Sequence, residues 1–308
     1  MKRSLILFIS FIAVTVPLRP LPTYAQAGKA GLAFLKFGVS GRGLAMGDAM
    51  TAQASGAAAT FYNPAGVLSD NSGSTQFLLM HREWIQDVRA QFLGVSVQLD
   101  EHRALGVSVN AASVSDIEVR TRPGRPEDTF TSHDFAVSAT YAQRFSDHVC
   151  IGVSGKFLFE KIFVDDANGF AFDIGAHYTP PIDHLQFGIM LANIGSMKAM
   201  RTQKITLPAL LRAGSGYSFP IESMTSELMV SADIVYVFPE KKSSFNFGGE
   251  LMFDETVAAR AGYQAGTHAR GLSAGVGIKH DMFNLDYGFI PLAEGLGSGH
   301  TVSLAITF

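Results

Sequence analysis

From about residue 75 to its last residue, the chain repeats one pattern: roughly ten residues alternate between apolar and polar side chains, and a turn follows. In "LSAGVGIKH", for example, Leu272, Val276 and Ile278 share one face, whereas Ser273 and Lys279 share the other. The closing segment "TVSLAITF" repeats this alternation. A period of two is typical of a β-strand whose two faces meet different surroundings. The pattern therefore predicts an all-β fold.

Applied along the chain, the same pattern predicts fourteen strands. They are expected near residues 75–84, 91–99, 104–113, 133–145, 148–160, 170–179, 184–194, 208–218, 226–237, 245–253, 256–265, 271–280, 282–290 and 300–308. Connections after odd-numbered strands are predicted to be long, and those after even-numbered strands are mostly short. Long loops on one rim and tight turns on the other are typical of an outer-membrane barrel.

A soluble sandwich shows the same alternation, so the choice between sandwich and barrel rests on further features. The apolar face is nearly free of charge at mid-strand, whereas the polar face carries Lys156, Asp173, Arg212, Asp233, Glu250, Arg260, Lys279 and Asp286. A lipid-facing Arg or Lys at the bilayer midplane costs about 2 to 4 kcal/mol, so a membrane barrel requires this segregation. Aromatic residues gather at strand ends on the apolar face, as interfacial girdles do, among them Phe145, Tyr178 and Phe308. The prediction is a transmembrane antiparallel β-barrel in the outer membrane of a Gram-negative-type bacterium.

The N-terminus predicts export. Lys2 and Arg3 precede an apolar run over residues 5–16, and the small-residue site Ala25-Gln26-Ala27 follows. This is the pattern of a signal peptide, residues 1–27, removed before Gly28. The alternative, a membrane anchor, needs roughly 20 apolar residues. The formal charge of −3 gives no basic field for nucleic acid, and no cofactor or metal is expected.

Residues 28–74 lack strand alternation and are rich in small residues. A barrel of fourteen strands leaves a wide lumen, so this segment is predicted to fold back as a hatch that plugs it. The glycine spacing Gly41, Gly43, Gly47 fails the dinucleotide-binding fingerprint, which also needs a preceding strand. The expected organisation is a signal peptide over 1–27, a hatch over 28–74 and a barrel over 75–308.

The stretch "GVSGRGLAMGDAMTAQASGAAATFYNPAGVLS" resembles the N-terminal signature of PorV/PorQ-type proteins, within the FadL-like superfamily of outer-membrane barrels. The matching residues are Gly41, Arg42, Gly43, Met46, Gly47, Asn63, Pro64, Ala65 and Gly66. The resemblance implies a hatch in the lumen, with the Asn-Pro-Ala turn close to the start of the barrel.

Two functions follow from this resemblance. The first is an accessory role in type IX protein secretion and surface delivery, in contact with the translocon or with exported client proteins. The alternative is FadL-like transport of long-chain fatty acids or other hydrophobic small molecules, with such a molecule or detergent in the lumen. Outer-membrane lipid is a partner in both cases.

A lipid-modifying enzyme is the least favoured function. "GLSAG" matches a nucleophile elbow, but Ser273 lies inside an alternating strand and is expected to face the lumen. His177 and His184 flank a proline turn and lack a third metal ligand, and Cys150 is expected to be an unreactive strand residue.

The longest predicted outer loops span residues 114–132 and 195–207, and binding residues tend to collect on such loops. Their candidate partner-binding residues are Arg120, Arg122, Arg125, Lys198, Arg201 and Lys204. Met197 and Met200 add adaptable apolar surface. Charged loops are also ordinary solvated surface, and that alternative stays open.

Overall fold

The structure is a computed structural model that describes residues 30–68, 75–85, 87–221, 225–267 and 269–308. The predicted signal peptide, its cleavage site and residues 69–74 of the predicted hatch lie outside the described residues. None of the described helices is both long enough and apolar enough to cross a membrane.

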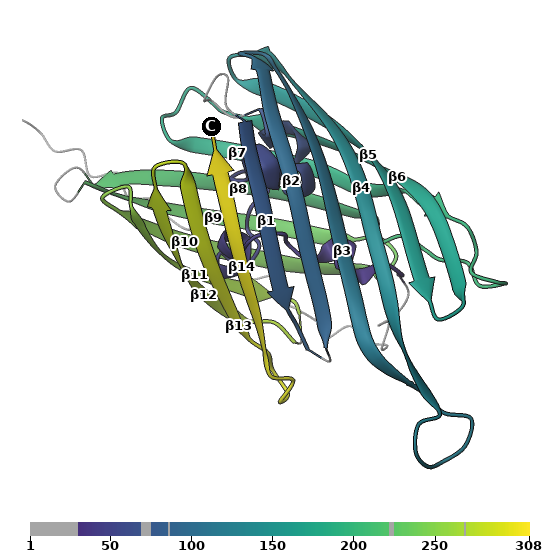
Figure 1. Cartoon of the computed structure of the whole chain (residues 1–308). Helices are drawn as coiled ribbons and strands as arrows, with labels where there is room; N and C mark the ends of the chain where they lie inside the picture. The colour runs from purple at the N-terminus through teal and green to yellow at the C-terminus, as the bar shows by residue number, and fades with distance from the viewer. Residues whose placement is uncertain (1–29, 69–74, 86, 222–224, 268) are drawn as a thin grey trace, which may run out of the picture.

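Fourteen antiparallel strands form one closed barrel, as predicted (Figure 1). The strands are β1 (Thr75–Glu83), β2 (Val88–Asp100), β3 (Arg103–Val119), β4 (Asp128–Ser146), β5 (Val149–Ile162), β6 (Asp165–Tyr178), β7 (Leu185–Met197), β8 (Leu210–Ile221), β9 (Ser226–Val237), β10 (Lys242–Phe253), β11 (Val257–Ala265), β12 (Leu272–His280), β13 (Phe283–Pro291) and β14 (Ser298–Thr307). Each strand pairs with its sequence neighbours, and β1 pairs with β14, with Leu79 opposite Leu304. The ring therefore has no free edge.

The two faces of the wall have the predicted characters. On β12, Leu272 is 68% exposed on the outside, whereas Ser273 is 4% exposed and points into the lumen. The predicted lumen-facing charges are buried there, with the exception of Lys279, which is exposed near the rim where β12 ends. The outside of the barrel is a broad apolar surface of the kind that a bilayer covers.

Several strands extend beyond the predicted boundaries, which corrects the predicted loops. The connection between β3 and β4 is residues 120–127 rather than 114–132, because Ile117 pairs with Phe130 and Val119 with Asp128. The connection between β5 and β6 shrinks to residues 163–164. The polar character of residues such as Glu118 predicts a loop, but a strand that projects past the membrane no longer needs alternating apolar side chains.

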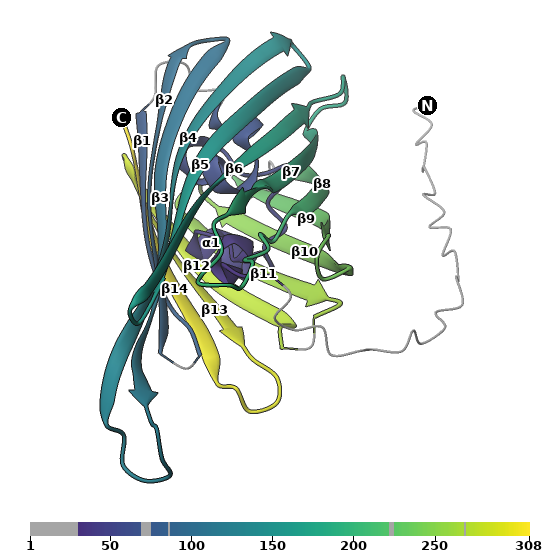
Figure 2. The same ribbon diagram turned by 90° about the vertical axis from the view of Figure 1, so that its right-hand side faces the viewer.

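The barrel has two unlike rims, although the alternation of connection lengths is weaker than predicted. The short-turn rim, where Phe308 lies, carries the connections 101–102, 147–148 and 281–282. The long-loop rim carries the connections 120–127 and 198–209, and the β3–β4 hairpin projects from it (Figure 2).

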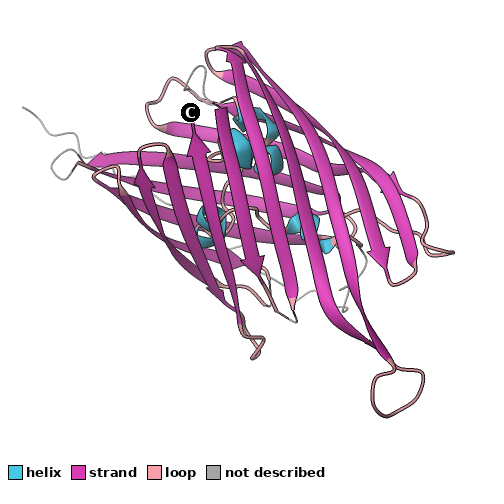
Figure 3. Cartoon of the chain, viewed as in Figure 1, coloured by secondary structure: helices cyan, strands magenta, loops and turns pink. Residues whose placement is uncertain are grey.

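The segment before the barrel forms four short helices: η1 (Ala33–Lys36), α1 (Gly41–Ala45), α2 (Gly56–Tyr62) and η2 (Pro64–Val67). These helices lie inside the ring of strands, as Figure 3 shows. Residues 30–68 are called the lumen segment below. Most of its residues are buried, and they form the centre of the core.

Candidate functional site

Local capping explains why the lumen segment turns where it does. The Ser40 hydroxyl accepts a hydrogen bond from the Gly43 N–H at 2.9 Å and starts α1. The Asn63 side chain accepts one from the Ala65 N–H at 3.2 Å and starts η2, with Pro64 in the first turn. Ser and Asn are preferred caps because their short side chains reach free N–H groups at a helix start, and Pro suits the next position. The Asn-Pro-Ala element is thus a capped turn.

Glycines on the lumen-facing side of the strands lie where the lumen segment touches the wall. A Cβ on Gly152 would come within 2.3 Å of the Pro64 carbonyl carbon, and one on Gly288 within 2.5 Å of the Gly41 oxygen. Contacts within 3.1 Å of the lumen segment are found in the same way for Gly94, Gly106, Gly175, Gly188, Gly216, Gly248, Gly262 and Gly275. Only glycine permits so close an approach. Ten strands of the wall are therefore shaped to the lumen segment.

A buried group of charges joins α1 to the wall. Arg42 donates two hydrogen bonds to the Glu250 carboxylate, at 2.9 and 2.8 Å. Arg260 also contacts Glu250, and its Nη1 donates to Asp286 Oδ1 at 2.8 Å. Two guanidiniums thus meet two carboxylates, with Arg260, Glu250 and Asp286 buried and Arg42 partly exposed. Ion pairs of this kind are costly to break once buried, because the partner left behind stays charged and unpaired.

Further hydrogen bonds, several of them to carboxylates, fix the rest of the lumen segment. Thr51 donates from both its N–H and its hydroxyl to Asp233, at 2.9 and 2.6 Å. The Asn63 amide donates to the Thr51 carbonyl at 2.9 Å and to the Ala176 carbonyl at 3.2 Å. Tyr62 donates to Asp48 Oδ1 at 3.0 Å. Hydrogen bonds from the lumen segment therefore reach β6, β9 and β10 at once.

The residues that the sequence offered as a possible nucleophile or as metal ligands have structural contacts instead. The Ser273 hydroxyl faces the lumen, as expected, and donates to the Ala45 carbonyl at 3.1 Å. His177 Nε2 lies 3.0 Å from the Thr51 carbonyl oxygen, whereas His184 lies in the connection 179–184 with a φ of 64°. The Cys150 thiol donates to the Ala65 carbonyl at 3.3 Å. All but His184 serve to hold the lumen segment.

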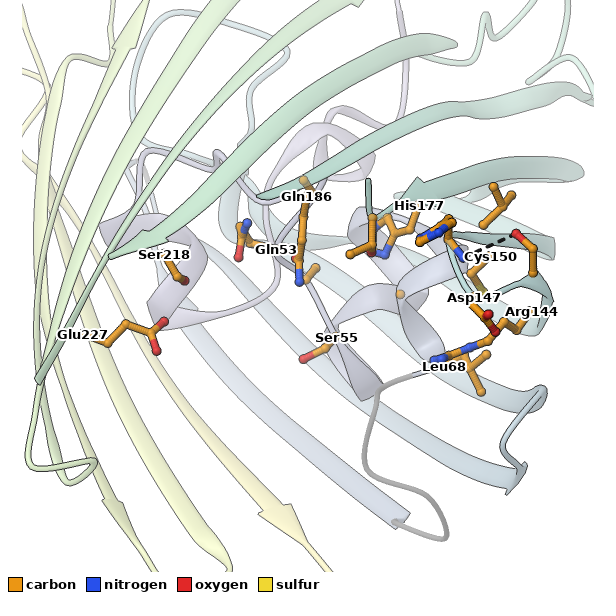
Figure 4. Close-up of a pocket in the computed structure, with 17 residues that line it drawn as sticks. Gln53, Ser55, Leu68, Arg144, Asp147, Cys150, His177, Gln186, Ser218 and Glu227 are labelled. Atoms are coloured by element: carbon orange, nitrogen blue, oxygen red, sulfur yellow. Dashed lines mark hydrogen bonds between the residues drawn. The ribbon is translucent and has the colours of Figure 1, made fainter. Parts of the chain in front are cut away.

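A polar pocket of about 540 Å³ lies between the lumen segment and the wall at the short-turn rim. Figure 4 shows side chains from both sides pointing into it, including Gln53, Ser55, Arg144, His177, Gln186 and Glu227. A second pocket, of about 410 Å³, lies under the long-loop rim. The two pockets share no lining residue, since the lumen segment stands between them.

The predicted rim residues lie in two separate places. Arg120, Arg122 and Arg125 are exposed in the connection 120–127, where Arg120 pairs with Glu118 at 2.6 Å. Lys198, Arg201 and Lys204 are exposed in the connection 198–209, where Arg201 pairs with Asp165 at 2.8 Å. Their role in binding a partner stays a prediction.

The connection 198–209 rests directly on the start of the lumen segment. The Gly31 N–H donates to the Thr206 carbonyl at 2.9 Å. Met197 is buried with Leu32, Phe34 and Leu35, so it is not the exposed docking residue that the sequence predicted. The sequence missed this arrangement because Met197 belongs to β7, whose inward positions continue to the rim.

Comparisons with known proteins agree with this geometry. A family model described as "Type IX secretion system protein PorV" matches residues 25–237. No curated protein matches the chain. Three solved outer-membrane structures share the fold. The Pseudomonas putida toluene transporter TodX has 13% identity and a TM-score of 0.64, over 88% of this chain and 97% of its own. The CymD monoaromatic hydrocarbon channel has 14% identity and a TM-score of 0.56, over 90% and 97%. A Pseudomonas aeruginosa FadL homologue has 11% identity and a TM-score of 0.54, over 88% and 98%.

Proposed function

This chain belongs to the PorV family of type IX secretion system proteins, and we propose that it is an accessory barrel that engages exported proteins or their translocon at its long-loop rim. The protein resides in the outer membrane of a Gram-negative bacterium, where lipid covers its apolar outer face. The proposal includes no catalytic step.

The main support for this proposal is that the lumen segment is fixed to the wall on nearly every side. Displacing the lumen segment would break the glycine contacts and the Arg42–Glu250 pair, which costs free energy. A barrel filled in this way is a rigid support for its loops rather than an open pore. Rigid scaffolds that present loops are suited to binding other proteins.

The long-loop rim offers a surface of the right kind. Arg122 and Arg125 are exposed at the tip of the projecting β3–β4 hairpin, and neither forms an ion pair with a described residue. Charges at the edge of an interface speed the encounter with an oppositely charged partner. We therefore expect the partner surface to be acidic.

A second candidate function is transport of a hydrophobic small molecule, favoured by one observation. The pocket under the long-loop rim has an apolar wall that includes Leu210, Val235 and Val237. TodX is a toluene transporter and CymD a monoaromatic hydrocarbon channel, and both share this fold. Fold alone does not transfer function, so transport ranks second.

The two functions separate in one experiment. We would replace residues 121–126 and, separately, residues 199–204 with short Gly-Ser turns, and measure surface delivery of type IX clients beside uptake of toluene and oleate. Lost delivery with normal uptake is expected. A matched charge variant, Arg122→Ser with Arg125→Ser, should reduce delivery, whereas Glu101→Ser at the other rim should not. Normal delivery with lost uptake would overturn the secretion role in favour of transport.

A further inference from the structure

Strand β7 extends further toward the long-loop rim than its neighbour β8. The ladder between them ends where Ala192 pairs with Leu210, and residues 194–197 of β7 pair only with β6. No backbone hydrogen bond among the described residues joins 194–197 to the connection 198–209. Although the ladders close the ring, this end of β7 is left with an open side. An open strand edge is a template for pairing with another chain.

The alternation of the ladder shows which backbone groups face the open side. The Lys198 N–H donates to the Asn168 carbonyl of β6 at 2.9 Å. In an antiparallel pair every second residue bonds to the same neighbour, so Ser196 also faces β6, whereas Gly195 and Met197 direct their N–H and C=O groups to the open side. Backbone groups without a partner are costly on a face that lipid covers, so a strand that pairs with them is stabilised.

The connection 198–209 does not supply that partner, because its returning half is bound inside the barrel. The Thr206 carbonyl accepts from the Gly31 N–H at 2.9 Å, and the Pro208 carbonyl accepts from Asn193 Nδ2 at 3.2 Å. Proline also has no N–H to give to a strand. The open side of β7 is therefore built into the fold.

Apolar side chains lie beside the open side. Phe170 and Phe172 of β6 are 61% and 64% exposed, and Ile194 of β7 is 43% exposed on the same outer face. On the lumen side the edge is bare, because Gly195 has no side chain and a Cβ there would lie 2.0 Å from the Phe170 oxygen. A segment along this edge would pack apolar side chains outward and have room for small ones inward.

The connection next to the edge is basic. Lys198 and Lys204 are exposed and form no ion pair with a described residue, whereas Arg201 is paired with Asp165. Opposite charges speed the encounter of two partners and fix their register. The surface is therefore matched by a segment with an acidic residue at its rim end.

We propose that residues 194–197 of β7 bind an extended segment of another protein, which adds a strand beside β7 through hydrogen bonds to Gly195 and Met197. The segment alternates apolar and small polar residues and has an acidic residue at its rim end. In strand addition of this kind, main-chain hydrogen bonds give affinity and the alternate side chains give specificity.

A second barrel of this chain does not fit as the partner. The start of β8 and the connection 198–209 flank the edge, so they leave room for a single strand and not for a second wall. The inference rests on the proposed function only in naming an exported protein as the source of the segment.

The test uses the full barrel in detergent and the peptide acetyl-Glu-Val-Thr-Val-Thr-Val-amide, whose β-branched residues favour a strand. Hydrogen exchange followed by mass spectrometry should show protection of residues 193–197 when the peptide is added, and none in the connection 147–148. By calorimetry, N-methylation of both threonines should weaken binding about tenfold or more, because inward-facing threonines direct their N–H groups to β7. N-methylation of the first two valines alters the other edge of the peptide and should leave its affinity unchanged.

Variants of the barrel test the side chains around the edge. Phe172→Thr should weaken peptide binding about fivefold through lost apolar contact. Lys198→Ser with Lys204→Ser should weaken it about threefold at low salt. Phe247→Thr on β10 is the matched control, since Phe247 is also outward and 49% exposed, and it should bind the peptide as the unaltered barrel does. Heat-modifiable migration shows whether each variant is folded, and the methylated peptides decide if Phe172→Thr is not.

Equal weakening by the two sets of N-methyl groups, no protection of 193–197, or equal effects of Phe172→Thr and Phe247→Thr would overturn the proposal. Barrel dimers in light scattering that protect 193–197 without peptide would also overturn it, because a second copy would then cover the edge. None of these outcomes affects the loop-replacement test of secretion, and lost secretion activity does not alter peptide binding. The two proposals can therefore fail separately.

Discussion

Gly262 of β11 and Gly47 of the lumen segment are so close that a Cβ on Gly262 would lie 2.2 Å from the Gly47 nitrogen. The Ala45 oxygen would lie 2.7 Å from the same Cβ. The wall and the lumen segment thus meet backbone to backbone, without side chains that could rearrange to make room. Each alanine added at such a contact must move one of the two.

Gly262→Ala is expected to lower the stability of the barrel by about 1 to 3 kcal/mol, as overpacking of a tight core does. The midpoint temperature of heat-modifiable migration measures the change. Gly249→Ala is the matched control on the neighbouring strand β10, because nothing lies within 4 Å of its added Cβ. Equal midpoints for the two variants would contradict the tight contact.

Arg260→Met is expected to destabilise the protein by about 3 to 5 kcal/mol, because it leaves Asp286 buried without its cation. Urea unfolding in lipid vesicles, followed by Trp84 fluorescence, measures this. Arg103→Met removes a fully exposed pair with Asp100 and should leave the unfolding midpoint unchanged. Adding Asp286→Leu to Arg260→Met should restore part of the stability. No difference between Arg260→Met and Arg103→Met would show that the buried cluster contributes nothing.

Deletion of residues 30–60 tests whether the lumen segment plugs the pore. The remaining strands should still form a heat-modifiable barrel, since their ring closes through β1 and β14. Single-channel conductance in planar bilayers should rise, because a lumen of this size then fills with water. The control is the barrel in which a Gly-Ser turn replaces loop residues 121–126, and its conductance should equal that of the unaltered protein. Unchanged conductance after the deletion would rule out a plug.

Export predicts a mature chain that begins at Gly28. Mass spectrometry of the protein from outer-membrane fractions should give the mass of residues 28–308. Replacing Ala25 and Ala27 with bulky residues should block cleavage and leave the longer chain. A mature protein that retains Met1 would contradict the signal peptide.

The strands were predictable from the sequence because the outer face of the barrel is apolar and the lumen face is polar. Residues along each strand therefore alternate between the two characters. Leu272 and Ser273 show this alternation within one strand. The ends of β3 and β4 were not predictable, because pairs such as Glu118 with Thr129 need only backbone hydrogen bonds.

The contacts of the lumen segment lie beyond what one sequence reveals. Arg42 and Glu250 are 208 positions apart, and nothing in either neighbourhood identifies the other as its partner. One signal was present: Gly275 shares the polar face with Ser273, where a larger polar residue would be expected, and a Cβ on it would lie 2.5 Å from the Ala45 Cβ. Glycines on that face mark where other backbone approaches.

The order in which the chain can assemble follows from where α1 is attached. Its partners lie on β10 to β14, the last part of the chain to be made, with the Gly41 N–H donating to Ser303 at 2.9 Å. Helix α1 therefore reaches all its native contacts only when β14 is in place, and contacts so distant in sequence form slowly. We therefore expect the seam between β1 and β14 to close only after the N-terminal helices have entered the lumen.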